Sequence, residues 1–225
     1  MPLSQLDRSR EVPMSAATAT PASTPDIDAQ IERLIDLGVA SLASLSDDEF
    51  RALASALDRD AEGIVVVHDS LVPPSRLAPL LDHEGKRGFV VEDMVDLDAF
   101  APIADVDIPA RPLYVITHVE RGDDMRNWSP EEALAKITAD GRRPLTIGEG
   151  ISWLLQHPEQ LEPNHCFMTI ASRLHKKAGL DARTPAIWIS GGTGRDGRAN
   201  RGAPKVGWCW NRNRHTWLGF ASTRP

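Results

Sequence analysis

The sequence is poor in cysteine and tyrosine, and it has no long hydrophobic run. Only Cys166 and Cys209 occur among 225 residues. Two cysteines are too few for a disulfide scaffold and are typical of free thiols in a reducing compartment. No stretch of about 18 apolar residues is present, and the first residues lack the basic start and apolar core of an export signal. These absences predict a cytoplasmic protein without a membrane partner.

The composition is that of an ordinary globular chain, with 41% hydrophobic and 25% charged residues. A chain of this length can bury enough apolar surface to fold without disulfides or structural metal ions. Residues 1–25 are the exception, because they are rich in Ala, Ser, Thr and Pro and have few bulky apolar groups. Such a segment cannot offset the entropy of becoming ordered. We therefore predict a disordered tail over residues 1–25 and a single domain over residues 26–225.

Charge is distributed unevenly along the chain. Residues 173–225 contain 11 Lys or Arg and 2 Asp or Glu, a net charge of +9, so residues 1–172 must carry −16 of the total of −7. Four of the six Trp residues also lie in the basic segment. This segment could form an anion-binding surface. It could equally pair with the acidic remainder of the same fold, or with a second copy of the chain in a homodimer.

Capping patterns predict helices in the first half and in the middle of the chain. Apolar residues from Ile27 to Ile35 follow helical spacing, and Gly38 stands where a C-terminal cap belongs. Capping-box spacing occurs in three pairs: Ser46 with Glu49, Ser129 with Glu132, and Thr146 with Glu149. PPSRLAPLL predicts a further helical turn after Pro73.

β-Branched and aromatic runs predict the strands. They are IVVVHD, GFVVED, PLYVITHVE, CFMTIAS, AIWIS, VGWCW and HTWLGFA, and the basic stretch after CFMTIAS is interpreted as a helix or loop. The Gly-rich residues 191–202 lack the ending of a phosphate-binding P-loop and favour a hairpin connection. This order of elements predicts an α+β fold, in which N-terminal helices precede a mixed or antiparallel sheet with helices packed on it.

Several of these segments resemble a family of bacterial proteins that is described only as a domain of unknown function. The resemblance covers roughly residues 26–222 and rests on LVPP, GFVVEDMVDLDAF, RGDDMRNWSPEEA, PLTIGEGISWLLQHPE, NHCF, AIWIS and GWCWNRNRHTWLG. It implies a single bacterial domain, with no activity to transfer.

Thiol and imidazole groups form one candidate site. His165 precedes Cys166, and Cys209 is followed by His215. A cysteine nucleophile needs a nearby imidazole or cation, so these residues, assisted by Asp123, could serve a hydrolase or transferase. Burial of both thiols as small apolar groups is the alternative. Zinc is disfavoured because adjacent His165 and Cys166 would point to opposite faces of a strand, and no metal or other cofactor is predicted.

An aromatic and basic cluster near the C-terminus is the leading candidate. Trp210 and Trp217 flank a turn that contains Arg212, Arg214 and His215, and Trp128 lies in an acidic loop that could approach them. Indoles beside cations suit a base with a phosphate, as in a nucleotide or single-stranded nucleic acid. In GWCW, however, Trp208 and Trp210 share one face and could simply fill the core. The histidines at 68, 83, 118, 157 and 175 lack ligand spacing and are assigned no role.

The sequence thus favours a binding protein for an anionic, aromatic ligand such as a nucleotide. A Cys/His enzyme and an interaction protein without a small ligand remain the alternatives.

Overall fold

The computed structural model describes residues 25–225 and confirms the α+β fold. The predicted tail lies outside the described residues, except for its last position. The α-helices are α1 (Ile27–Asp36), α2 (Val39–Leu42), α3 (Asp47–Ala54), α4 (Pro74–Leu77), α5 (Pro130–Ala139) and α6 (Ile147–Gln156). The longer strands are β1 (Ile64–Val67), β6 (Leu113–Glu120), β8 (Cys166–Met168), β12 (Arg183–Ile189), β13 (Pro204–Trp210), β14 (Leu218–Phe220) and β15 (Ser222–Arg224). The two-residue strands are β2 (Asp82–His83), β3 (Lys86–Arg87), β4 (Phe89–Val90), β5 (Ala101–Pro102), β7 (Arg143–Pro144), β9 (Ser172–Arg173), β10 (His175–Lys176) and β11 (Gly179–Leu180).

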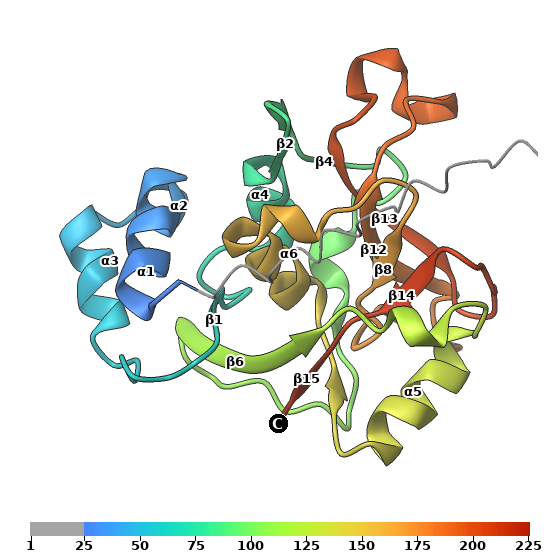
Figure 1. Ribbon diagram of the computed structural model, residues 1–225, viewed down its shortest axis with the longest axis horizontal. Helices are drawn as coiled ribbons and strands as arrows, with labels where there is room; N and C mark the ends of the chain where they lie inside the picture. The colour runs from blue at the N-terminus through green and yellow to red at the C-terminus, as the bar shows by residue number, and fades with distance from the viewer. Residues whose placement is uncertain (1–24) are drawn as a thin grey trace, which may run out of the picture.

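Two sheets organise the described chain (Figure 1). The first has the order β1-β6-β15-β7 and is antiparallel throughout. The second has the order β14-β8-β12-β13-β4 and is mixed, because β14 and β4 run parallel to their neighbours whereas β12 is antiparallel to β8 and β13. The chain from Leu218 onward supplies a strand to each sheet in turn, which ties the two together.

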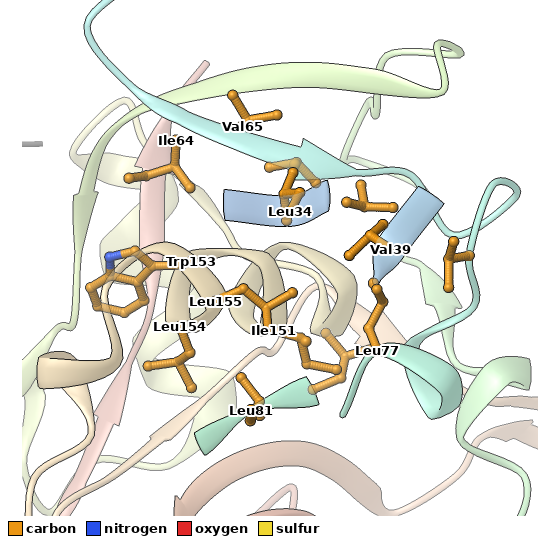
Figure 2. Close-up of a cluster of buried hydrophobic side chains, with 14 of the residues drawn as sticks. Leu34, Val39, Ile64, Val65, Leu77, Leu81, Ile151, Trp153, Leu154 and Leu155 are labelled. Atoms are coloured by element: carbon orange, nitrogen blue, oxygen red, sulfur yellow. The ribbon is translucent and has the colours of Figure 1, made fainter. Parts of the chain in front are cut away.

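Helix α6 forms the centre of the molecule, and all of its residues are buried. Figure 2 shows Ile151, Leu154 and Leu155 of α6 within a cluster that also contains side chains from α1, α2, α4 and β1. On another side α6 approaches the second sheet at Gly150, where a Cβ would lie 2.6 Å from Cγ2 of Thr169. Apart from the buried Glu149 and Gln156, the helix therefore has apolar or small residues all round, unlike a surface helix with one apolar stripe.

A second apolar cluster lies between the second sheet and α5. It contains Met125, Ala133, Ile137, Cys166, Met168, Ile170, Ala186, Leu218 and Phe220, with Trp188 and Cys209 packed against it. Residues of the opposite face, such as Phe167, Ile187 and Val206, belong to the main core. The sheet is thus covered on both faces, which explains its continuous apolar runs.

The structure confirms the predicted caps and corrects the prediction for the basic stretch. All three capping boxes form, and Gly38 adopts φ +88° after α1. The basic stretch predicted as a helix or loop is instead a hairpin of β10 and β11, which turns at Gly179 with φ +118°. The sequence analysis also missed β15, because three residues at a chain end are too short for a periodic pattern. No helix within residues 25–225 has the length and apolar character needed to cross a bilayer.

Gly122 holds the segment after β6 against β14, and its replacement should be costly. Its φ is +72°, and a Cβ would lie 2.3 Å from the carbonyl oxygen of Phe220. Gly122→Ala is expected to lower the free energy of unfolding by about 2–3 kcal/mol, because left-handed strain adds to overpacking. Gly141 is the matched control, since its φ is +67° but nothing lies within 4 Å. In urea denaturation Gly141→Ala should show only the strain of about 1 kcal/mol, and equal losses would contradict the close contact.

Candidate functional site

The tryptophans of β13 share a face, as their alternation indicates. The rings of Trp208 and Trp210 lie 4.5 Å apart with an edge-to-face tilt of 66°. Trp208 packs against the main core and donates from Nε1 to Oδ1 of Asp93 at 3.3 Å. Trp210 is 47% exposed. The shared face of β13 therefore contacts the core at Trp208 and solvent at Trp210.

The turn between β13 and β14 lies on the N-terminal end of α5. Nη2 of Arg214 donates to Oε1 of Glu132 at 2.5 Å, and Nε of Arg212 lies 3.6 Å from Oε1 of Glu131. The backbone N–H of Asn127 donates to the carbonyl of His215 at 2.9 Å. Both arginines therefore have carboxylate neighbours, although such exposed ion pairs contribute little stability and exchange readily.

Several other cations of the basic segment also pair with acidic side chains. Arg183 binds Asp96 at 2.6 Å and Asp181 at 3.0 Å, and Arg195 binds Asp93 at 2.8 Å. Lys205 lies 2.7 Å from Oδ1 of Asp196. Four arginines of the basic segment, Arg183, Arg195, Arg212 and Arg214, thus pair with carboxylates from the acidic part of the same chain. Net charge alone therefore gives weak support for an anion-binding surface.

Trp217 lines a cavity of about 300 Å³ on the sheet face that carries Cys209. Its other lining residues are Asn164, His165, Cys166, Trp188, Ile189 and Gly191. Trp217 is 43% exposed, and the ring of His215 stacks on it with centroids 4.6 Å apart and a tilt of 23°. Stacking on His215 fixes the orientation of the indole at the cavity.

Trp188 is held in place by β13. A Cβ at Gly207 would lie 2.8 Å from Cη2 of Trp188, and Nζ of Lys205 lies 4.6 Å from the centre of its ring. Lys205, Gly207 and Cys209 share the face of Trp188, whereas Trp208 and Trp210 lie on the other. The structure therefore separates Trp210 from Trp217 and gives Trp217 a different aromatic neighbour.

The environments of the two thiols suit packing residues better than catalytic nucleophiles. Cys166 is 1% exposed, and burial raises the pKa of its thiol despite the opposing positive charges of Arg121 and Lys205. Burial likewise raises the pKa of Cys209. Both cysteines are free, and a thiol with a raised pKa is a poor nucleophile at neutral pH. This environment argues against the hydrolase or transferase alternative.

The remaining predicted residues do not join the thiols. Asp123 begins a 3-10 turn (Asp123–Met125) and lies 3.3 Å from Nε of Arg121, outside the lining of the Trp217 cavity. Trp128 is 37% exposed and does not line that cavity either. His165 precedes β8, so it is not held to the opposite face from Cys166, and both residues line the cavity.

Two further predictions concern the Gly-rich stretch and metals. The Gly-rich residues connect β12 to β13, which confirms the hairpin (Figure 1). Within residues 25–225, no three His, Cys, Asp or Glu side chains are grouped so as to hold a metal ion.

Comparison with known proteins identifies the family. The model of a family described as "Family of unknown function (DUF5701)" matches residues 33–225. The chain belongs to this family. No curated protein and no solved structure matches it. The DUF5701 match covers the whole of the second sheet and both candidate regions, so all residues that line the cavity lie within it.

Four residues that line this cavity were not predicted as part of a site: Asn164, Trp188, Ile189 and Gly191. AIWIS was interpreted only as a strand, because alternation shows which residues share a face but not what covers that face. Asn164 adopts φ +61°, a left-handed conformation that Asn tolerates, and it lies in a connection without a repeating pattern. In the connection before β8, the NHC string was therefore the only sequence feature that pointed to the cavity.

Proposed function

We propose that the protein binds a planar aromatic ligand with an anionic group, such as a nucleotide, in the cavity lined by Trp188 and Trp217. The main supporting observation is that two indoles, Trp188 of β12 and Trp217 of the turn before β14, line one cavity whose volume lies within the usual range for small ligands. Asn164 and His165 add polar groups that could select the edge of a ring.

The exposure of Trp217 supports stacking of the ligand on its indole. A half-exposed indole oriented by a stacked imidazole loses little side-chain freedom when a second ring joins it. Base stacking on an aromatic side chain contributes about 1–3 kcal/mol and does not depend on a particular base. The cavity therefore predicts a preference for ring systems over extended anions.

For the anionic group we propose Arg212 and Arg214, with His215, in the turn that leads to Trp217. The guanidinium of Arg212 is 87% exposed and its nearest carboxylate is 3.6 Å away, so a phosphate can replace that contact at low cost. Arg214 is held more firmly by Glu132. The contribution of the phosphate should thus be smaller than that of the ring.

Binding can be tested with adenosine monophosphate, adenosine and ribose 5-phosphate. We expect the monophosphate to raise Tm most, adenosine to raise it less, and ribose 5-phosphate to raise it least. Trp217→Ala should raise the Kd by about tenfold or more, as loss of one stacking partner implies. Trp210→Ala is the matched control, because its indole is equally exposed but outside the cavity.

Two outcomes would overturn the proposal: no Tm shift with any aromatic probe at millimolar concentration, or equal losses of affinity in the two Trp variants. Cys209→Ser should bind as the wild type does, because Cys209 does not line the cavity. A loss of turnover in that variant, with binding retained, would instead support the Cys/His enzyme.

A further inference from the structure

A second cavity, of about 320 Å³, lies between β1, β6 and the C-terminal end of α6. Its lining includes Glu62, His118, Arg121, Trp153, His157 and Gln160. None of these residues was assigned a role by the sequence analysis, and none lines the Trp217 cavity. Two imidazoles and one guanidinium at one cavity form a strongly polar arrangement.

Arg121 is buried at this cavity, with 8% of its surface exposed. Nη1 donates to the backbone carbonyl of Gln160 and lies 3.9 Å from Oε1 of Glu162. Nε lies 3.3 Å from Oδ1 of Asp123 without hydrogen-bond geometry, and Nη2 has no hydrogen-bond partner within residues 25–225. Nε and Nη2 form the guanidinium edge that holds a carboxylate or phosphate with two parallel hydrogen bonds. Asp123 lies close to Nε, but Nη2 is buried without an acceptor, which is unfavourable and points to a ligand at this edge.

His157 contributes a second buried and unpaired polar atom. Its Nδ1 lies 2.7 Å from Oε1 of Glu159, a contact that orients the ring. Nε2 is buried and has no hydrogen-bond partner among the described residues. An imidazole held at one nitrogen by a carboxylate presents the other nitrogen in a fixed direction.

His118 lines the same cavity from an irregular point of β6. Its φ is +50°, which is unfavourable for a residue with a Cβ. The pairing of β6 with β15 shifts register here, since Ser222 is opposite Glu120 but Arg224 is opposite Thr117. Such bulges redirect side chains and are frequent beside functional sites, as is backbone strain.

We propose that this cavity binds a small oxyanion, a carboxylate or a phosphate, on the Nε and Nη2 edge of Arg121, with His157 and His118 beside it. The site is separate from the one proposed for an aromatic ligand. Asp123 and Glu162 lie close to the guanidinium, so the affinity for a free anion should be modest.

The test uses the full chain with sodium phosphate and sodium acetate as separate probes, and sodium chloride at equal ionic strength as the reference. We expect phosphate, acetate or both to raise Tm beyond chloride, and the stronger probe to identify the class of oxyanion. Arg121→Gln should raise the Kd of that probe by about tenfold or more, because a charge-assisted hydrogen bond is lost.

His118→Gly separates a binding role from a structural one. Glycine tolerates the positive φ, so the free protein should melt at the same or a higher temperature, whereas the Tm shift caused by the anion should fall by at least half. If Arg121→Gln fails to fold, the result for His118→Gly alone tests the proposal. Equal effects of chloride and both probes, or an undiminished shift in His118→Gly, would overturn the proposal. Trp217→Ala should leave the anion shift unchanged, which keeps the two sites distinguishable.

Discussion

Replacing Glu149 by alanine is expected to lower the free energy of unfolding by about 3–5 kcal/mol. The carboxylate is completely buried and accepts from both Nη atoms of Arg143, at 2.9 and 2.6 Å. It also accepts from the backbone N–H of Thr146 at 2.8 Å and from the hydroxyl of Tyr114 at 3.2 Å. Alanine would leave a buried guanidinium without its partner and remove the cap of the central helix.

Glu132 provides the matched control for this prediction. It occupies the same position of a capping box, in α5, but its carboxylate is exposed. Urea denaturation should show a much smaller loss of stability for Glu132→Ala, because water replaces the lost contacts. Comparable losses in the two variants would mean that the cap, and not the buried pairing with Arg143, dominates.

The two capping boxes also show how far the sequence predicts the structure. Spacing alone located the first turns of α5 and α6, because a capping box is a contact between residues three apart. It could not distinguish the exposed Glu132 from the buried Glu149. Burial of Glu149 depends on Tyr114 and Arg143, which reach α6 from β6 and β7 through tertiary packing.

The candidate site, too, could be predicted from the sequence only in part. Alternation in β13 correctly placed Trp208 and Trp210 on one face. It could not place Trp188 beside Trp217, since that requires the register of β12 with β13 and the parallel pairing of β14 with β8. The irregular position of His118 could not be predicted either. PLYVITHVE has the composition of a regular strand, and only the pairing with β15 reveals the bulge.

Asp69→Asn should stabilise the protein at alkaline pH and have little effect near pH 4. Burial, the negative charge of Glu149 and that of Asp98 together raise the pKa of Asp69 to about 7. The carboxyl group lies against the first turn of α6, where a Cβ at Gly148 would be 2.0 Å from its Oδ1. Asparagine has the same shape but carries no charge, so it removes the cost of burying an ionised group.

The direction in which stability changes with pH follows from the protons bound by the folded and unfolded states. Between about pH 4 and 7 the folded state holds the proton on Asp69 and the unfolded state does not, so stability falls as pH rises. Above about pH 7 the full cost is present, about 4 kcal/mol at 1.36 kcal/mol per unit of pKa. The stability of Asp69→Asn relative to the wild type, measured by urea denaturation from pH 4 to pH 8.5, should therefore increase through this window and then level off.

An exposed carboxylate serves as the reference for this pH dependence. Asp60→Asn alters a solvated side chain, so its stability relative to the wild type should stay nearly constant over the same range. The comparison removes every pH-dependent contribution that the three proteins share. A flat difference for Asp69→Asn would show that Asp69 is ionised in the folded state throughout. In that case the groups at the first turn of α6 would compensate its charge, and Gly148 would be needed for close approach of a carboxylate and not of a neutral acid.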